Sequence, residues 1–195
     1  DDVYVLEDEN VEGTYYETIW DTGGNDTIKY SGQRNAQIDL LAATIDYTPT
    51  GGGVVSYVDG VFGGITIARG VEIENAEGGS GNDTLLGGSG NDPLTGRDGE
   101  DTLLGGDGDD MLSPGADADY VDGGAGNDTL RYNGDAGVSI NLETGVFQGG
   151  EAEGDVIHDI ENLYGTIHDD LLIGDAGLNV LQGHFGDDVL RGGDG

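Results

Sequence analysis

The chain has 195 residues, 40 of them glycine, and a formal net charge of -34 against only six lysine and arginine residues. So few basic residues exclude nucleic acid as a partner, because binding it requires cations that displace counterions, and they disfavour anionic membrane surfaces too. The lack of cysteine excludes disulfides and thiolate sites, and no run of about 18 apolar residues predicts membrane insertion. Two readings remain: a disordered acidic chain, or a fold completed by bound cations.

Residues 1–77 read as an N-terminal module of β-strands. The stretches "NAQIDLLAATIDY" and "GGITIARGVEIEN" alternate apolar or β-branched residues with polar ones between glycines, which is the pattern of strands. Between them, "TPTGGGVVSYVDGVFGG" predicts a glycine-rich hairpin, and no segment of the chain has a helical period. The chain begins at "DDVYV" without methionine and stops inside a repeat at "GGDG", so we expect a piece of a longer protein.

Six nonapeptides follow without a gap over residues 78–131: GGSGNDTLL, GGSGNDPLT, GRDGEDTLL, GGDGDDMLS, PGADADYVD and GGAGNDTLR. Aspartate occupies every sixth position, namely Asp83, Asp92, Asp101, Asp110, Asp119 and Asp128. An apolar residue occupies every eighth position, namely Leu85, Leu94, Leu103, Leu112, Val121 and Leu130. Such regularity predicts a solenoid rather than disorder.

Residues 132–164 form a second strand module, and residues 165–195 a second, degenerate array. "GNDTIKYSG" near the start of the chain recurs as "GNDTLRYNG", and "EIEN" recurs as "DIEN", so the two strand modules are internal duplicates. In the second array the sixth positions are Asp170, Asn179 and Asp188. The chain therefore reads as strand module, array, strand module, array.

The nonapeptide chemistry favours a hard cation. Glycines at positions one, two and four allow positive φ and tight turns, so carbonyl oxygens can point into the loop beside the aspartate. Such oxygens suit Ca²⁺ rather than zinc. Two nonapeptides make one coil, which stacks equivalent loops as parallel strands about 4.8 Å apart, a spacing that an ion can bridge. One apolar residue returns about 2–3 kcal/mol against about 9–18 kcal/mol of backbone entropy per nonapeptide, so we expect the arrays to fold only when calcium binds.

Two resemblances follow from these motifs. "GGSGNDTLLGGSGND" resembles the RTX calcium-binding repeats, while "ETIWDTGGNDTIKYSG" and "ITIARGVEIENAEGGSGNDTLLG" resemble the C-terminal domain of serralysin-type (M10) secreted metalloproteases over roughly residues 1–113. The resemblance implies an all-β fold, a right-handed parallel β-roll with flanking strand modules stacked on it. It further implies a non-catalytic, calcium-loaded module of a bacterial protein that is exported by type I secretion.

The resemblance also implies ligands. In the family each roll ion takes carbonyls from the first four loop positions and two aspartates from loops eighteen residues apart, so Asp83 pairs with Asp101, Asp92 with Asp110, Asp101 with Asp119 and Asp110 with Asp128. The family also has ions near the junction where its protease domain joins the roll. Asp21, Gly23 and Asp26, with the Asp2 carbonyl nearby, match one of these sites, and Gly24, Asp26, Glu72 and Glu74 match another. By analogy, the internal duplication extends the second set to Gly126, Asp128, Asp159 and Glu161. The remaining predicted ligands are Gly78, Gly79, Ser80, Gly81, Gly87, Gly88, Ser89, Gly90, Gly96, Arg97, Asp98, Gly99, Gly105, Gly106, Asp107, Gly108, Gly123, Gly124, Asp170 and Asp188.

Some repeats depart from the pattern. Pro93 removes a donor from its strand, and the loop "PGADAD" at 114–119 has Pro114 and Asp117 in place of glycine. We expect any gap in the ion ladder at that loop. Arg97 is tolerable because its position contributes a carbonyl. In the second array, His168, His184 and Asn179 replace the expected residues, which predicts fewer ions there.

No catalytic constellation is visible. The protease signature HExxH is absent, and His158, His168 and His184 are isolated, so we interpret them as solvated loop residues. The acidic pairs Asp109/Asp110 and Asp169/Asp170 are read as calcium ligands or surface charge before acid-base catalysts. "GGEAEGD" at 149–155 is read as an acidic surface turn, with a further calcium loop as the alternative. Tyr15, Tyr16 and Trp20 are expected to pack beneath the first strand module rather than to form a sugar platform.

The leading functional hypothesis is a non-enzymatic, calcium-driven folding module of a secreted bacterial protein, monomeric and served by a type I secretion apparatus. The parent protein is expected to be a serralysin-like metalloprotease. A carbohydrate-binding module of a polysaccharide-active enzyme is the second hypothesis, with neutral glycans favoured because basic residues are scarce. A surface adhesin is the third.

Overall fold

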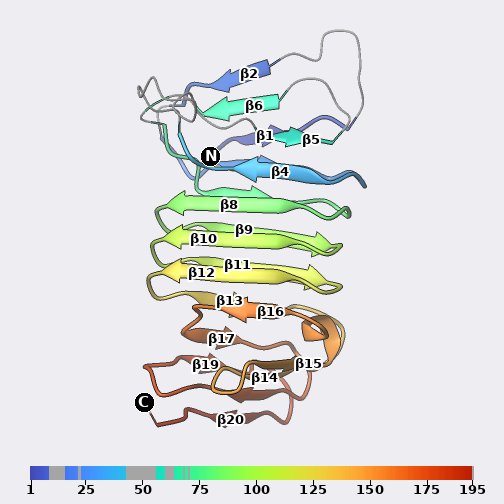
Figure 1. Ribbon diagram of the computed structural model, residues 1–195, viewed down its shortest axis with the longest axis vertical. Helices are drawn as coiled ribbons and strands as arrows, with labels where there is room; N and C mark the ends of the chain where they lie inside the picture. The colour runs from blue at the N-terminus through green and yellow to red at the C-terminus, as the bar shows by residue number, and fades with distance from the viewer. Residues whose placement is uncertain are drawn as a thin grey trace.

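The computed structural model describes residues 1–8, 16–21, 23–42, 56–59, 64–67, 69 and 71–194. These residues form an elongated stack of short strands, with the N-terminal strands in the upper part of Figure 1 and the C-terminus at the bottom. Most pairings between strands are parallel, and the strands of the array lie in two layers, one in front of the other. The predicted all-β parallel β-roll is confirmed.

Four sheets make up the stack. The largest has the order β1-β3-β7-β9-β11-β13-β17-β19, with bounds Val3–Val5, Thr27–Lys29, Asn75–Glu77, Pro93–Asp98, Met111–Ala116, Thr129–Arg131, Asn162–Tyr164 and Leu181–Gln182. A six-stranded sheet has the order β16-β12-β10-β8-β4-β5, with bounds Val156–His158, Tyr120–Ala125, Thr102–Asp107, Thr84–Ser89, Ala36–Asp39 and Tyr57–Val58. A four-stranded sheet, β15-β14-β18-β20, spans Val146–Gln148, Ser139–Asn141, Leu171–Ile173 and Val189–Arg191, and β2 (Tyr16–Ile19) pairs with β6 (Gly64–Ile67). The 3-10 helix η1 spans Gly150–Ala152.

The array alternates between the two large sheets. Strands β8, β10 and β12 lie in the six-stranded sheet, and β9, β11 and β13 in the eight-stranded one. Leu85 stands opposite Leu103, and Leu103 opposite Val121, so paired strands are eighteen residues apart, as two nonapeptides per coil predict. All six eighth-position side chains of this array are 0% exposed. A single apolar residue per nonapeptide thus builds a continuous, narrow core.

The strand modules extend the same two sheets. On the N-terminal side β7 pairs with β9 and β4 with β8, and on the C-terminal side β17 pairs with β13 and β16 with β12. The buried Tyr30 and Tyr132 occupy equivalent places in the two copies. We propose that segments 1–77 and 132–164 are two strand modules and segments 78–131 and 165–195 two nonapeptide arrays, all within this one stack.

The predicted strands outside the arrays are present where the chain is described. β4 lies in "NAQIDLLAATIDY" and β6 in "GGITIARGVEIEN", and the antiparallel pair β14 and β15 lies in the predicted second strand module. Most of the predicted hairpin at 48–64 lies outside the described residues, although β5 pairs antiparallel with β4. In the described part of the chain, no helix has the length and apolar character needed to cross a membrane.

Candidate calcium sites

Aspartates form a column along the six-stranded sheet, each directly before a strand. The Asp83 N–H donates to Asp101 Oδ1 and the Asp101 N–H to Asp119 Oδ1, both at 2.7 Å. At the N-terminal end, the Ala36 N–H donates to Asp83 Oδ1 at 2.6 Å. Because pairing at eighteen residues places equivalent loops over one another, the repeat itself produces this column of carboxylates.

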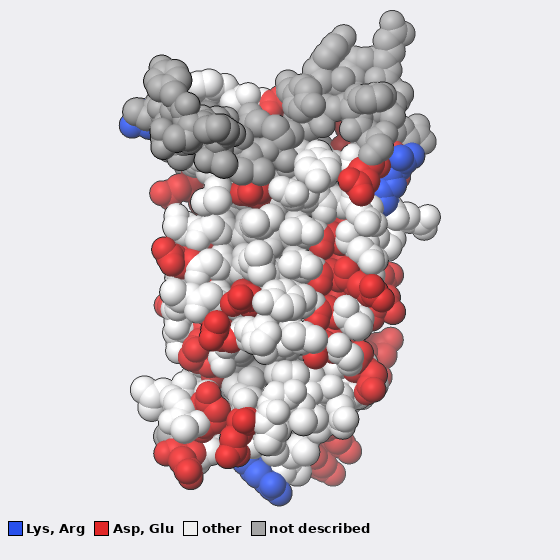
Figure 2. Space-filling model, in the orientation of Figure 1, with Lys and Arg blue, Asp and Glu red and all other residues white. Residues whose placement is uncertain are grey.

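A second column follows the eight-stranded sheet and includes glutamates from the strand modules. Its steps, each from a backbone N–H to a carboxylate oxygen at 2.7 or 2.8 Å, run from Asp2 to Asp26, Asp26 to Glu74, Asp92 to Asp110, Asp110 to Asp128 and Asp128 to Glu161. Figure 2 shows Asp and Glu gathered mainly toward the two sides of the stack, with a largely uncharged strip between them. The charge is therefore concentrated away from the middle of this face.

We call each carboxylate residue of such a column a rung. Six of the aspartate rungs have one side-chain oxygen without a protein partner. Among the described residues, the buried side-chain oxygens that lack a hydrogen bond are Oδ2 of Asp26, Asp92, Asp101, Asp110, Asp119 and Asp128, all at most 4% exposed. Burial, reinforced by neighbouring carboxylates, raises the pKa of Asp101 to about 8 and the pKa of Asp92 and Asp119 to about 7. A buried carboxylate in this state is unfavourable as an anion unless a cation pairs with it.

Backbone carbonyls of the next coil face the same places as these oxygens. A Cβ atom added to Gly96 would lie 2.3 Å from both Asp101 Oδ2 and the carbonyl oxygen of Pro114. A Cβ added to Gly105 would lie 2.2 Å from Asp110 Oδ2. Glycine at the first position therefore keeps a small space that carboxylate and carbonyl oxygens line. This all-oxygen donor set fits Ca²⁺.

The loops have two conformations that differ at the second position. Five loops, which we name open, have φ between 91° and 112° there, at Gly88, Arg97, Gly106, Gly115 and Gly124. The aspartates of these five loops are the ones in the arrays with an unpartnered Oδ2. In three loops, which we name closed, the second-position N–H donates to the sixth side chain: Gly79 to Asp83 at 2.6 Å, Thr166 to Asp170 at 2.7 Å and Asp175 to Asn179 at 2.9 Å. The open loops are therefore the stronger candidates for calcium.

The closed loops include two predicted ligands. Asp83 receives the Ala36 and Gly79 N–H groups, one on each carboxylate oxygen. Asp170 likewise receives N–H groups from Val138 and Thr166. In both, the loop's own second-position N–H occupies the Oδ2 that is unpartnered in the open loops, which weakens them as ligands of an ion shared with the next coil. Their role as ligands stays a prediction.

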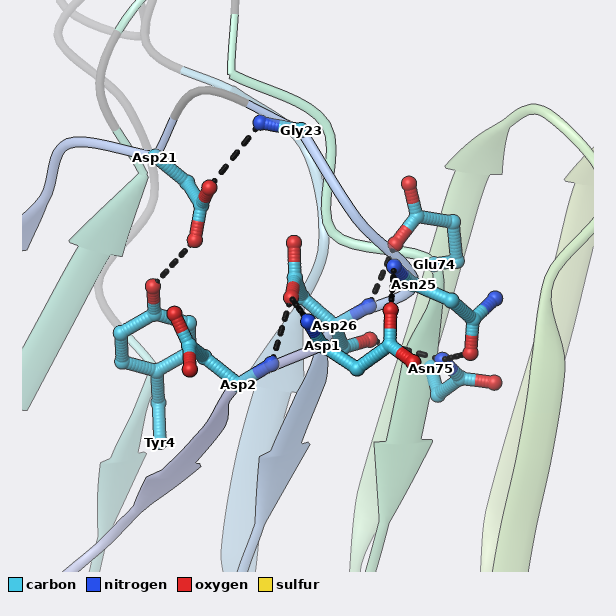
Figure 3. A network of polar contacts seen from close by, with 9 residues as sticks. All are labelled: Asp1, Asp2, Tyr4, Asp21, Gly23, Asn25, Asp26, Glu74 and Asn75. Carbon is cyan, nitrogen blue, oxygen red and sulfur yellow. Dashed lines mark hydrogen bonds and ion pairs between the residues drawn. The ribbon is translucent and has the colours of Figure 1, made fainter.

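Three carboxylates meet at the N-terminal junction (Figure 3). One oxygen each from Asp2, Asp21 and Asp26 lies within 4.8 Å of the other two, and no other group of three metal-type side chains occurs among the described residues. The Gly23 N–H donates to Asp21 at 3.0 Å, so the predicted set of Asp21, Gly23 and Asp26 is brought together. The Asp2 carbonyl accepts the Thr27 N–H at 3.0 Å, and the Asp2 carboxylate supplies the third member of the group.

The other junction set, Gly24, Asp26, Glu72 and Glu74, is brought together in part. Glu74 accepts the Asp26 N–H at 2.7 Å, and a Cβ added to Gly24 would lie 3.0 Å from Asp26 Oδ1. Glu72 is exposed and, together with Glu74, lines a cavity of about 220 Å³ against the open loop of Asp92. Glu74 thus connects the junction to the first array.

The duplicated set repeats this arrangement at the second module. The Asp128 N–H donates to Glu161 Oε2 at 2.8 Å. A Cβ added to Gly123 would lie 2.0 Å from the carbonyl oxygen of Asp159 and 2.8 Å from Asp128 Oδ2. The Asp159 carbonyl and Asp128 Oδ2 therefore both line the space beside Gly123. A Cβ added to Gly126 would lie 1.8 Å from a carbonyl oxygen one coil earlier, so glycine is required at that position.

The second array is less complete. The Asp170 N–H donates to Asp188 Oδ1 at 2.9 Å, but Asp188 is only half-buried. His184, at the second position of its loop, has a positive φ of 66° without being glycine, below the 91–112° of the open loops. Fewer ions in this array stays a prediction, and the two closed loops at Asp170 and Asn179 support it.

The structure does not favour the expected gap at residues 114–119. Gly115 and Asp117 have φ of 112° and 80°; φ is positive at the second position of every open loop and at the fourth-position residues Gly90, Gly99 and Gly108 as well. Asp119 Oδ2 is unpartnered like its neighbours. Pro93, the other departure, begins β9 without interrupting its pairing with β11. The loop keeps the open backbone because Asp117 accepts a left-handed conformation, which aspartate tolerates better than most residues.

Asp155 continues the aspartate column of the six-stranded sheet, which favours the alternative interpretation of residues 149–155, a calcium loop, over the preferred one, an acidic surface turn. Asp155 is 8% exposed, and its Oδ1 accepts the Asp119 N–H at 2.9 Å. The segment 149–155 is therefore not simply an acidic surface turn. The available signal was Asp155 and Ile157 at the sixth and eighth positions counted from Gly150. It was hidden because 36 residues, not eighteen, separate this rung from the one before.

The histidines are dispersed. His158 and His184 are exposed, His168 is half-buried, and the carboxylate group of three contains none of them. His158 packs on the ring of Tyr120 with 5.5 Å between ring centroids. This placement accords with solvated surface residues.

The expectation for Trp20 is wrong. We expected it to pack beneath the first strand module, but its side chain is 80% exposed. Tyr15 and the side chain of Tyr16 lie outside the described residues. A residue at the end of an edge strand, as Trp20 is after β2, can point away from the core whatever its apolar area.

Comparison with known proteins agrees with this geometry. A family model described as Peptidase M10 serralysin C terminal matches residues 2–156, and one described as RTX calcium-binding nonapeptide repeat (4 copies) matches residues 164–195. Serralysin of Photorhabdus laumondii is 45% identical over 86 residues, which are 44% of this chain and 15% of that protein. Serralysin C of Dickeya chrysanthemi is 46% identical over 69 residues (35% and 13%), and metalloprotease AprA of Pseudomonas entomophila is 44% identical over 70 residues (35% and 12%).

The chain thus matches only 12% to 15% of the length of these relatives. The matched region is their C-terminal, non-catalytic domain. Because the first family match covers most of the residues, the chain belongs to the family of peptidase M10 serralysin C-terminal domains, and its RTX nonapeptide repeats bind Ca²⁺.

Proposed function

We propose that this chain is a non-catalytic module that folds on calcium binding outside the cell and supports type I secretion and stability of a larger protein, a serralysin-like metalloprotease. The observation that carries the proposal is the set of buried, unpartnered carboxylate oxygens along the two columns. With a net charge of -34, the chain has too few cations of its own to neutralise them.

Bound calcium supplies the positive charge and oxygen coordination that the stacked carboxylates require. The chain's own residues prepare the site. Open loops turn the second-position N–H away from the carboxylate, first-position glycines keep the space clear, and the leucine column holds the coils in register. Because these loops cannot stack as bare anions, the free energy of binding is also free energy of folding.

This coupling suits export through a narrow channel. In the low calcium of the bacterial cytosol the arrays would stay unfolded, and in the calcium-rich exterior they would fold and remain folded. Membership in a family of C-terminal serralysin domains supports this role, since serralysins are secreted proteins. We propose a monomeric module in an extracellular, bacterial setting.

Circular dichroism of the isolated chain during calcium titration tests the proposal. We expect little β signal in chelator, a cooperative rise with calcium, and a much weaker response to magnesium at equal ionic strength, because Mg²⁺ demands a stricter octahedral shell. A full β signal in chelator would show that folding does not wait for calcium.

The proposed lack of catalytic activity is tested separately, by an assay of hydrolysis. The calcium-loaded chain should release no product from a casein or peptide substrate, with or without added zinc, since no metal-binding histidine group is present among the described residues. Hydrolysis that copurifies with the folded chain and survives a second purification step would contradict this part of the proposal.

Carbohydrate binding is the second candidate, and the exposed Trp20 favours it. A solvent-facing indole can stack on the apolar face of a sugar ring. A glycan array probed with the calcium-loaded chain, alongside Trp20→Ala, decides. Binding that the substitution abolishes supports this role, and no binding to any neutral glycan removes it.

A further inference from the structure

Beyond the nonapeptide array, the six-stranded sheet has one more parallel strand. β16 pairs with β12, with Tyr120 opposite Val156. The Val156 N–H donates to the Asp119 carbonyl at 2.8 Å, and equivalent bonds join each earlier pair of this sheet's array strands. In the backbone pairing of this sheet, Asp155 therefore occupies the position that follows Asp119.

The side chains continue the pattern. Asp119 Oδ1 accepts the Asp101 N–H at 2.7 Å, and the Asp119 N–H donates to Asp155 Oδ1 at 2.9 Å. Asp119 Oδ2 has no partner, although the side chain is only 2% exposed. Asp119 thus has the same contacts as Asp101: its Oδ1 accepts an N–H, its Oδ2 has no partner, and its own N–H donates to the next carboxylate, which is Asp155.

The segment 149–155 takes the place of a nonapeptide loop. Gly149, Gly150 and Gly154 all have positive φ, at 76°, 53° and 101°, and Ala152 between them is 0% exposed. A Cβ added to Gly154 would lie 3.0 Å from the Cβ of Ala118, so this segment packs directly against the open loop of Asp119. Glycines again permit the close approach of two loops.

The column ends at Asp155. β16 is the edge of its sheet in the described part of the chain, so no further rung follows. The Tyr132 hydroxyl, on a side chain that is 1% exposed, donates to Asp155 Oδ2 at 2.5 Å. At this last rung a protein hydroxyl therefore satisfies the oxygen that is left without a partner at Asp101 and Asp119.

We propose that the calcium column of the six-stranded sheet extends one rung past the array, to a site between the loop of Asp119 and the segment 149–155, and that Tyr132 closes the column beneath it. The proposal rests on the calcium-dependent function proposed above. It assigns Asp155 as a ligand that belongs to no nonapeptide of the array, and Tyr132 as a residue that positions it. The second strand module thereby finishes an ion column that the array begins.

Native mass spectrometry of the full chain at saturating calcium counts the bound ions. Asp155→Asn keeps an oxygen for the Asp119 N–H but removes the charge, and we expect it to hold one ion fewer than the wild type. The matched control is Asp122→Asn, a half-buried residue of β12, which should keep the wild-type number. A folded Asp155→Asn protein with the wild-type ion number overturns this inference. A wild-type chain that binds no calcium overturns the proposed function instead.

Should the asparagine variant not fold, terbium in place of calcium decides. Tyr132 contacts the Asp155 carboxylate, so its ring would sensitise a lanthanide in the proposed site. Tyr132→Phe should bind the same number of terbium ions with lower tyrosine-sensitised emission, whereas Tyr57→Phe, on the distant β5, should lose much less. Equal emission losses in the two variants would overturn the site.

Discussion

The two nonapeptide arrays share a sequence pattern but not a structure. In the first, every eighth-position side chain is 0% exposed, whereas in the second Leu172 is buried, Leu181 half-buried and Leu190 46% exposed. The first array has five open loops with unpartnered carboxylates and one closed loop, at Asp83, whereas the second has two closed loops among its three. We propose from this difference that an aspartate at position six is not enough for an ion site. An ion site would also require that the second-position N–H does not bond to the aspartate and that neighbouring coils bury it.

The largest expected contrast between the arrays is their response to acid without calcium. Burial raises the pKa of Asp92 and Asp119 to about 7 and of Asp101 to about 8, from an ordinary 3.8. These carboxyls therefore destabilise the metal-free fold increasingly as pH rises from about 4 to about 8, and protonation removes the penalty. In chelator, β10 should gain protection from hydrogen exchange at about pH 5.5 relative to about pH 8.5, and more than β20 does.

The intrinsic pH dependence of exchange must be corrected for in that comparison. Equal corrected protection of β10 at both pH values would show that the unpartnered carboxylates do not govern the metal-free state. The direction is opposite to that of an ordinary salt-bridged aspartate, whose contribution is lost in acid.

Core truncation should separate the arrays next most strongly. Leu103→Ala removes a 0% exposed side chain between two paired strands and should lower the free energy of unfolding by about 2–5 kcal/mol. Leu190→Ala, at 46% exposure, should cost less than about 1 kcal/mol. Urea unfolding at saturating calcium measures both. Similar losses would mean that the second array is packed as tightly as the first.

Glycine substitution at the first loop position provides a matched pair. A Cβ on Gly105 would lie 2.2 Å from Asp110 Oδ2 and 2.5 Å from the Gly123 carbonyl oxygen, whereas one on Gly192 would meet nothing within 4 Å. Gly105→Ala should therefore destabilise the calcium-loaded chain by about 1–3 kcal/mol, and Gly192→Ala by less than about 0.5 kcal/mol. The same urea experiment compares them, and a harmless Gly105→Ala would argue against a tightly lined site.

Removing one ligand charge should give the smallest contrast. Asp110→Asn keeps the acceptor for the Asp92 N–H but loses the unpartnered anion, and should raise the calcium midpoint of folding at least about tenfold. Asp188→Asn, on a half-buried rung, should raise it less than about threefold. Titrations followed by circular dichroism give both midpoints. Equal shifts of the two midpoints would mean that the two rungs contribute equally to calcium binding.

Much of this architecture could be predicted from sequence. The eighteen-residue register, the buried eighth positions and the sixth-position column follow from a nine-residue period, because parallel strands joined by identical loops must pair like with like. The duplication of the strand modules predicted that Glu161 would stand to Asp128 as Glu74 stands to Asp26. The direction of Trp20 was predicted wrongly, and a calcium loop at Asp155 was only the second interpretation, because neither residue lies in a repeat whose period fixes its direction.

Period and composition alone determined that this chain is an all-β roll with columns of carboxylates, since repetition of a short loop and strand leaves few other ways to bury one leucine per unit. Which loops open was decided by tertiary contacts. Gly79 is glycine and yet lies in a closed loop, where a Cβ would lie 2.4 Å from the carbonyl oxygen of Gly32, while Arg97 adopts φ 91° in an open loop and pairs with Glu77 at 2.7 Å. Backbone conformation at these positions depends on what the neighbouring coil presents, and that neighbour is remote in sequence.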